Sequence, residues 1–240
     1  MCGRFVASTS AADLKQYFSV DRVDDNSDQE ANFNVTPLTE ILAVRERKSE
    51  RVLSRLKWGL VPNWAQDVGI GHRLINARLE TLAEKPAFRE AFTHRRCIIP
   101  VDGFYEWKVV GEPSTPKGRI PKTPTYIRRR DRAPLALAGL WEIYGQENGP
   151  NHWLRFCAII TTAAQGSLAD VHHRMPVMLP PNAWNQWLDP LGHDPQVLTG
   201  LVERYPSAEE VGRDLEVYPV STRVNNAQEN NPGLIEPVSQ

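Results

Sequence analysis

Short apolar and alternating runs dominate the pattern of hydrophobic and polar residues along the chain, and they predict β-strands. Prolines and glycines, 19 and 15 of the 240 residues, end most of these runs after a few positions. The predicted strands span residues 39–45, 53–59, 97–101, 104–109, 125–129, 135–141, 153–161 and 215–220.

Helical signals are few and lie between the predicted strands. One helix is predicted to start at Ser10, and the others cover 86–92, 180–188 and 194–205. Strands outnumber helices and do not alternate with them regularly, which argues against a doubly wound parallel sheet. The sequence therefore predicts an α+β fold with a curved, mostly antiparallel, barrel-like β core flanked by a few short helices.

The chain carries no repeat and no linker that would divide it. Residues 1–240 are therefore predicted to form a single domain, with a loosely held tail after about residue 225. Residues 21–30, which are acidic, and residues 110–123, which are rich in Gly, Pro and Lys, are predicted to be loops.

Composition narrows the class of protein. The longest apolar stretch, 134–141, is far shorter than the roughly 20 residues of a membrane helix, and the N-terminus lacks the apolar region of a secretory signal. An intracellular monomer is expected. Two of the three cysteines, Cys97 and Cys157, lie in apolar runs and are predicted to be buried. No Cys or His spacing indicates a metal site, so neither metal nor cofactor is predicted.

Charge is distributed unevenly along the chain although its net value is only −1. Residues 51–132 hold 17 Lys and Arg against 8 Asp and Glu, a net charge of +9, and the remainder therefore carries −10. Such a basic middle third is typical of a polyanion-binding face. The alternative is that folding scatters these charges over the surface.

Cys2 is a candidate nucleophile because removal of Met1 would leave a free amine and a thiol on one residue. Such an aminothiol condenses with an aldehyde to an imine, and the thiol then closes a five-membered thiazolidine ring. Unperturbed pKa values of about 8 for the amine and about 8.5 for the thiol put reactive forms within reach near neutral pH. The alternative is that a cysteine at this position is incidental.

Other candidates combine polar and aromatic residues. Asn76 and Arg78 are two positions apart, so an extended chain would place both on one face. Glu106 stands among aromatic residues and suits proton transfer, unless strand alternation turns it to water. His172 and His173 precede Arg174; in an extended chain the two imidazoles would face opposite sides, and Arg174 would share the face of His172.

Trp64 follows a segment in which aromatic and basic residues are interleaved, as in platforms that stack single-stranded bases. A buried core position is the alternative reading, especially for Trp58.

Taken together, these motifs resemble the SOS response-associated peptidase (SRAP) family, whose members shield abasic sites. The resemblance covers nearly the whole chain and rests on residues 1–5 (MCGRF), 33–37 (FNVTP), 58–64 (WGLVPNW), 75–78 (INAR), 102–107 (DGFYEW), 161–164 (TTAA), 172–176 (HHRMP) and 234–238 (LIEPV).

The resemblance implies a protein that bonds covalently to abasic sites in single-stranded DNA through a thiazolidine on Cys2, after self-processing removes Met1. It also implies that Asn76 orients the amine of Cys2 and the sugar, that Glu106 moves protons, and that His172 is an acid–base partner that helps reversal, with an associated lyase activity. The residues expected to contact DNA or line its pocket are Arg4, Asn34, Trp64, Arg78, Trp107, Thr161 and Arg174.

Two other functions fit the same residues. A cysteine peptidase would use the Cys2 thiol with His172 and with Asn76 or Glu106, and it would not need the free amine. A non-covalent binder of single-stranded or modified DNA would not need Cys2 at all.

Overall fold

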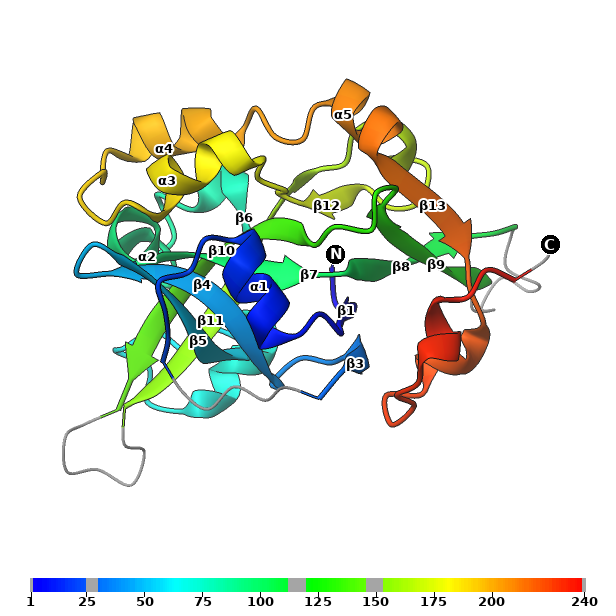
Figure 1. Cartoon of the computed structure of the whole chain (residues 1–240), viewed down its shortest axis with the longest axis horizontal. Helices are drawn as coiled ribbons and strands as arrows, with labels where there is room; N and C mark the ends of the chain where they lie inside the picture. The colour runs from blue at the N-terminus through cyan, green and yellow to red at the C-terminus, as the bar shows by residue number, and fades with distance from the viewer. Residues whose placement is uncertain (1, 25–29, 112–119, 146–152, 239–240) are drawn as a thin grey trace.

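Two β-sheets packed against each other form the body of the molecule in a computed structural model that describes residues 2–24, 30–111, 120–145 and 153–238 (Figure 1). The smaller sheet has the order β13-β9-β8-β1-β3. Its strands are β1 (Phe5–Ala7), β3 (Asn32–Val35), β8 (Gly103–Val109), β9 (Lys122–Arg129) and β13 (Leu215–Pro219).

The larger sheet has the order β12-β11-β10-β7-β4-β5-β2, with β6 paired to β11. An additional pairing of β11 with β5 joins β4, β5, β7, β10 and β11 into a ring. Its strands are β2 (Arg22–Val23), β4 (Glu40–Arg47), β5 (Glu50–Trp58), β6 (Asn76–Arg78), β7 (Arg96–Val101), β10 (Leu135–Tyr144), β11 (Leu154–Ala163) and β12 (Arg174–Pro176).

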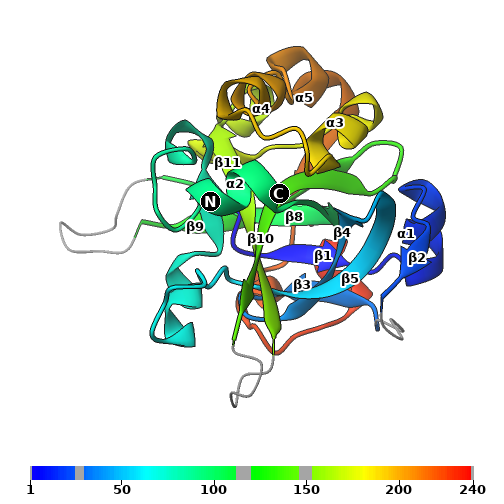
Figure 2. The ribbon, with the colours of Figure 1, turned by 90° about the vertical axis from the view of Figure 1, so that its left-hand side faces the viewer.

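Five short α-helices within the described residues complete the α+β fold that the sequence predicts. They are α1 (Ala11–Tyr17), α2 (Arg89–His94), α3 (Trp184–Leu188), α4 (Pro195–Val202) and α5 (Ala208–Asp214). Figure 2 shows α3, α4 and α5 gathered at one end of the molecule. No described helix is long and apolar enough to cross a membrane.

Strand alternation in the ring explains why its runs are almost continuously apolar. On β7, Ile98 enters a cluster covered by the helices, whereas Cys97 and Ile99 enter a second cluster that also contains Cys2. Because both faces are buried, each strand must be apolar on both sides. Cys97 and Cys157 are buried as predicted.

All eight predicted strands are present, with ends that differ by a few residues. The Ser10 side chain accepts a hydrogen bond from the Asp13 amide, 3.1 Å away, and so caps α1 as predicted. The helix predicted over 86–92 begins only at Arg89, because residues before it form turns. The helix predicted over 194–205 ends at Val202.

The tail after about residue 225 is not loosely held over the described residues, contrary to the prediction. Leu234 is fully buried, and Val220 forms a bridge with Pro237. Asn34 donates from Nδ2 to the carbonyl oxygens of Asn226 and Glu229, at 3.0 and 2.8 Å. These contacts fix the tail because they satisfy buried polar groups on both sides.

The two predicted loops fall largely outside the described residues. In the first, residues 25–29 are not described, and Arg22–Val23 forms strand β2. In the second, residues 112–119 are not described.

Candidate active site

Cys2 lies inside the molecule, immediately before β1. Pairing of Phe5 with Phe104 of β8 continues in a hydrogen bond of 2.9 Å from the amide of Tyr105 to the carbonyl oxygen of Arg4. This antiparallel course carries Cys2 toward Glu106. The side chain of Cys2 is fully buried, and burial first, then the charge of Glu106, raises the pKa of its thiol.

Asn76, on β6, holds the backbone of Cys2. Its Nδ2 donates to the carbonyl oxygen of Cys2 at 2.8 Å. Its Oδ1 is buried and has no hydrogen-bond partner among the described residues. A buried amide oxygen without a donor is costly, so this atom is a ready acceptor for an N–H group beside Cys2.

Glu106 on β8 faces inward and is only 5% exposed, so it does not turn to water. Tyr105 belongs to the cluster on the opposite face of β8. The Glu106 carboxylate acts electrostatically on two groups: it raises the pKa of the Cys2 thiol and opposes the lowering of the His172 pKa by burial. Because Coulomb interactions weaken with distance, these effects indicate that Glu106 lies near both the thiol and the imidazole.

The ring of His172 is oriented by the backbone of Arg174, whose amide donates to Nδ1 at 3.0 Å. The Arg174 amide donates to Nδ1 in the tautomer that carries its proton on Nε2, whereas a ring protonated at Nδ1 donates from that nitrogen to the Arg174 carbonyl oxygen, 3.2 Å away. The backbone of Arg174 therefore offers a partner to the ring in each of its protonation states. Burial lowers the pKa of His172, which favours the neutral ring.

The two histidine rings do not point to opposite sides as the sequence suggested. The centres of the His172 and His173 rings are 4.2 Å apart. Both residues precede β12, so the strand alternation that underlies the prediction does not apply to them.

Arg174 joins the two sides of the site. Its guanidinium binds both oxygens of Glu80, at 2.6 and 2.9 Å, and the carbonyl oxygen of Thr161 at 2.5 Å. β11, which carries Thr161, pairs with β6 on one side and β12 on the other. The pair of Glu80 and Arg174 thus ties the segment of Asn76 to the segment of His172. Glu80 received no role from the sequence, although it lies only four residues beyond Asn76.

Three residues expected to contact DNA or line its pocket form a network with the C-terminal tail. Arg4 donates to Oδ1 of Asn34 at 2.7 Å and to the carbonyl oxygen of Val224 at 2.9 Å. Trp107 donates to Oδ1 of Asn225 at 2.7 Å, and the Arg4 guanidinium lies 5.9 Å from the centre of its ring. The structure therefore places Arg4, Asn34 and Trp107 between the N-terminus and the tail.

The remaining expected DNA contacts differ in exposure. Thr161 is fully buried, whereas Arg78 is exposed at the end of β6. Trp64 is 58% exposed and lines a groove of about 550 Å³ together with Arg73. Trp58 is fully buried, in agreement with the core alternative.

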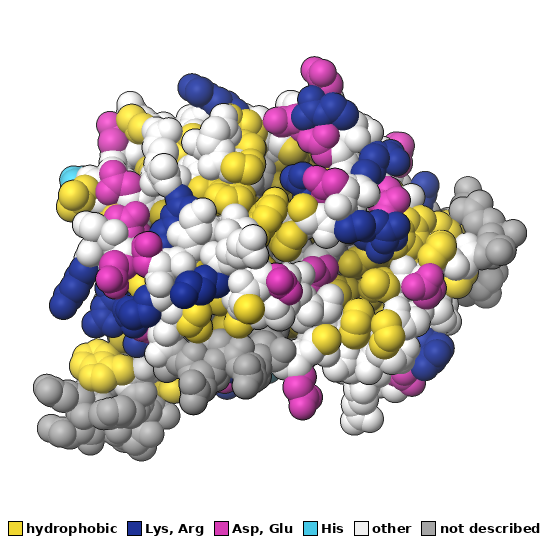
Figure 3. All heavy atoms as spheres, in the orientation of Figure 1, with side chains coloured by type: hydrophobic (Ala, Val, Ile, Leu, Met, Phe, Trp, Pro, Cys, Tyr) yellow, Lys and Arg dark blue, Asp and Glu magenta, His cyan; other side chains and the backbone are white. Residues whose placement is uncertain are grey.

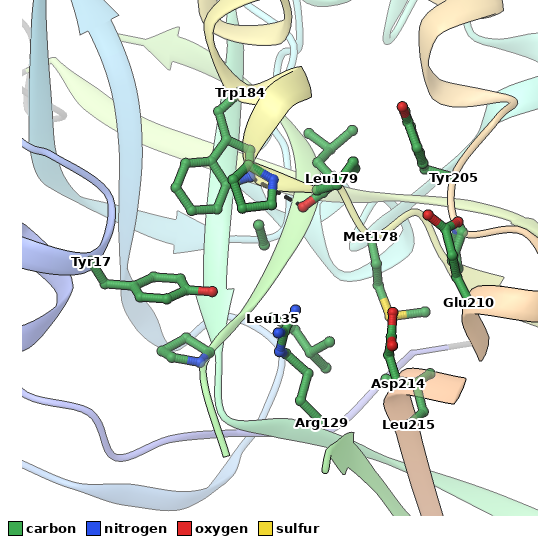
Figure 4. Close-up of a pocket in the computed structure, with 15 residues that line it drawn as sticks. Tyr17, Arg129, Leu135, Met178, Leu179, Trp184, Tyr205, Glu210, Asp214 and Leu215 are labelled. Carbon is green, nitrogen blue, oxygen red and sulfur yellow. Dashed lines mark hydrogen bonds between the residues drawn. The ribbon is translucent and has the colours of Figure 1, made fainter. Parts of the chain in front are cut away.

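A separate hollow of about 70 Å³ lies beneath α3 and α5, between Tyr17, Arg129 and Trp184 (Figure 4). It has room for about two water molecules, and its lining contains neither Cys2 nor Glu106. This hollow is therefore not part of the candidate site. Within the described residues, no group of three or more His, Cys, Asp or Glu side chains could hold a metal ion.

Comparison with known families matches residues 1–227 to the model of the SOS response associated peptidase (SRAP) family. The chain belongs to the SRAP family. The SRAP chain is 39% identical to the abasic site processing protein YoqW of Bacillus subtilis, over 98% of this chain and 99% of that protein. It is 30% identical to the abasic site processing protein YedK of Escherichia coli, over 99% of this chain and 100% of that protein.

Solved structures show the same SRAP fold. A protein of Bacteroides thetaiotaomicron superposes with a TM-score of 0.82 at 23% identity, over 99% of this chain and 100% of the other. A phage-related protein of Bordetella bronchiseptica superposes with a TM-score of 0.68 at 28% identity, over 91% of this chain and 94% of the other.

Proposed function

We propose that this SRAP protein captures abasic sites in single-stranded DNA covalently, through a thiazolidine on Cys2 that protects the site from strand cleavage. The observation that carries the proposal is the environment of the second residue: Asn76 binds its carbonyl oxygen, its side chain is fully buried, and the charge of Glu106 acts on both its thiol and His172. The names of the relatives from Bacillus subtilis and Escherichia coli, both abasic site processing proteins, support abasic sites as the target.

The reaction requires that Met1 is first removed, which frees the α-amine of Cys2. The amine attacks the aldehyde carbon of the ring-opened sugar, and the resulting carbinolamine loses one water to give an imine. The thiol then adds across the C=N bond: sulfur bonds to carbon, and the thiol proton passes to nitrogen. One water leaves overall, and no oxidant or cofactor takes part.

Each neighbouring residue has a role that fits its geometry. Oδ1 of Asn76 is buried and has no donor among the described residues. It accepts a hydrogen bond from the freed amine of Cys2 and so directs the lone pair of the amine at the sugar. His172 supplies the acid: its protonated ring donates a proton from Nε2 to the oxygen that departs as water, while Nδ1 donates to the carbonyl oxygen of Arg174. Glu106, whose charge acts on both the thiol and His172, accepts a proton from the thiol and returns it to nitrogen.

Burial of the thiol sets the order of these steps. Because desolvation raises the pKa of Cys2, the free thiolate is scarce, and the amine reacts first. Glu106 then allows the thiol to add as its proton leaves, without a persistent thiolate in an apolar site.

A peptidase activity restricted to Met1 is the companion function that the same residues support. The Cys2 thiol is adjacent in sequence to the Met1–Cys2 bond, and the buried carboxylate of Glu106, whose charge acts on the thiol, is the candidate base. Retention of Met1 in a Glu106→Gln protein made without methionine aminopeptidase, but not in wild type, is the expected result. Removal of Met1 from both proteins would contradict this activity.

The test of covalent capture uses mature protein and single-stranded DNA with one abasic site, separated on denaturing gels. Wild type is expected to form a stable adduct, and Cys2→Ala none. Cys2→Ser keeps the amine, so it is expected to give an adduct only when borohydride traps the imine. Failure of wild type to form an adduct, with loss of Met1 verified by mass, would overturn the proposal in favour of non-covalent binding.

A further inference from the structure

A groove of about 650 Å³ lies beside the candidate active site, between the smaller sheet and the segment that precedes His172. Its lining includes Lys108 and Thr125 from β8 and β9, Val217 from β13, and Asp170 and Val171. We propose that this groove is a nucleotide subsite, which holds the nucleotide next to the abasic sugar in the same DNA strand. This inference rests on the proposed function and specifies how the strand leaves the site.

The register of the smaller sheet connects the groove to the catalytic groups. Glu106 pairs with Thr125, and two positions further Lys108 pairs with Thr123. Directly opposed residues of an antiparallel pair share one face, as do alternate residues along a strand. Glu106, Lys108, Thr123 and Thr125 therefore form one continuous surface.

The opposite wall of the groove also adjoins the candidate active site. Val171 lines the groove and is followed directly by His172, and Thr125, which also lines the groove, is paired with Glu106. The groove therefore adjoins the segments that carry Glu106 and His172. An abasic sugar bound at Cys2 has a phosphate on each side, so the strand must leave in two directions, and this groove offers one of them.

The chemistry of the lining suits one nucleotide. Lys108 is exposed, and none of the ion pairs among the described residues involves it, so its ammonium is available to a phosphate. The Thr123 hydroxyl adds a donor and an acceptor, whereas the buried Thr125 hydroxyl donates to the carbonyl oxygen of Thr123 at 3.4 Å; Val171 and Val217 provide an apolar wall for a base. The volume exceeds the roughly 300 Å³ at which ligand pockets begin.

Among the described residues of the lining, Lys108 is the one cation and Asp170 the one carboxylate. One lysine suits contact with one phosphate. A longer run of phosphates would need more cations along the groove.

The test measures equilibrium binding of single-stranded DNA that carries a tetrahydrofuran abasic analogue, which has no aldehyde and cannot react. Lys108→Gln is expected to weaken binding several-fold at low salt and to reduce the slope of log affinity against log salt by about 0.7, the value for one phosphate contact. The matched control is Lys122→Gln, because Lys122 pairs with Val109 and belongs to the opposite face of the same hairpin. The control is expected to bind like wild type.

Two shorter DNAs locate the contact: one ends at the analogue on its 5′ side, the other on its 3′ side. Lys108→Gln is expected to weaken binding of one of them and to leave the other as in wild type. Equal binding of full-length DNA by Lys108→Gln and wild type would overturn the subsite, as would equal weakening by both lysine variants. Because no covalent step is involved, failure of adduct formation would refute the proposed function and leave this result standing.

Discussion

Replacing Glu80 by glutamine tests whether the bond between Glu80 and Arg174 holds Asn76 and His172 in position. The change keeps the size of the side chain and removes its charge. One side-chain oxygen can still accept a hydrogen bond from the Arg174 guanidinium. The new NH₂ group replaces the second acceptor by a donor, which faces another N–H donor of Arg174. Glu84→Gln is the matched control, because Glu84 is exposed and no hydrogen bond or ion pair of the described residues involves its side chain.

The expected magnitude follows from the exposure of the pair. Two short charge-assisted bonds in a buried site would contribute about 1.5–3 kcal/mol each. Here the Arg174 side chain is 11% exposed, but that of Glu80 is 49% exposed, so solvent screens much of the interaction. We therefore expect a loss of about 1 kcal/mol in the free energy of unfolding. The same energy lost from the transition state slows capture about fivefold, since 1.4 kcal/mol corresponds to a factor of ten.

The pH profile of the capture rate separates positioning from a general loss of stability. In Glu80→Gln, Arg174 is less constrained, so its amide holds the His172 ring less firmly and water reaches the imidazole. Burial lowers the pKa of His172, so solvation should raise that pKa and move the alkaline limb of the rate profile, on which the protonated ring is lost, to higher pH. A slower variant with an unshifted profile, or equal slowing by Glu84→Gln, would refute a positioning role.

Three further predictions concern stability. Asp24→Asn should cost about 3–5 kcal/mol in urea unfolding, because it leaves Arg45, which is 3% exposed and 2.5 Å from that carboxylate, without its counter-charge. Burial raises the pKa of Asp24, but Arg22 and Arg45 outweigh burial and hold this pKa below its usual value. The pair of Asp24 and Arg45 should therefore stabilise the fold above about pH 4 and lose its effect as pH falls further. A difference in stability between wild type and Asp24→Asn that does not depend on pH would contradict this. Gly103→Ala should cost about 3 kcal/mol in thermal or urea unfolding, because its Cβ would lie 2.4 Å from the buried Tyr126 ring and 2.6 Å from a backbone oxygen, and an unchanged transition would contradict the packing. Arg96→Met should cost about 3 kcal/mol or more, because the Arg96 guanidinium donates to backbone carbonyl oxygens at the ends of α2 and α3, and refolding with an unaltered urea midpoint would contradict that role.

The strands of the ring could be predicted from sequence because they are buried on both faces. Continuous apolar runs such as 135–141 fit strands buried on both faces, and their short length and flanking prolines and glycines distinguish them from buried helices. β1, β6 and β12 have only three residues each, too few for any periodicity. These strands carry or adjoin Cys2, Asn76 and His172, so the elements that build the site are those least visible in the pattern.

The catalytic candidates were recognised through motifs, whereas the contacts of the DNA candidates were not. A motif shows the type of each residue but not the residue that it contacts. Arg174 donates to Glu80, and Arg4 donates to Asn34, which lies 30 positions away along the chain. The contacts at the start of helix α5, in contrast, can be recognised in the sequence, because the capping box of Ser207 and Glu210 joins residues three positions apart.

Folding also changes how much the basic residues of segment 51–132 contribute to the surface charge. Arg95 pairs with Glu142 and Arg128 pairs with Glu216, so carboxylates from outside residues 51–132 neutralise part of its charge. On the face drawn in Figure 3, basic and acidic side chains are interspersed. Net charge along the sequence therefore overestimates the basic surface that folding leaves.

The most direct test of the central claim is the intact mass of the adduct between the mature protein and a short abasic oligonucleotide, measured before and after borohydride. A thiazolidine predicts the sum of the two masses less one water, unchanged by borohydride, with Cys2 no longer available for alkylation under denaturing conditions. An adduct that gains two hydrogens on reduction and keeps a free Cys2 thiol would be an imine only. That result, or the absence of any adduct, would contradict covalent capture by both nucleophiles of Cys2.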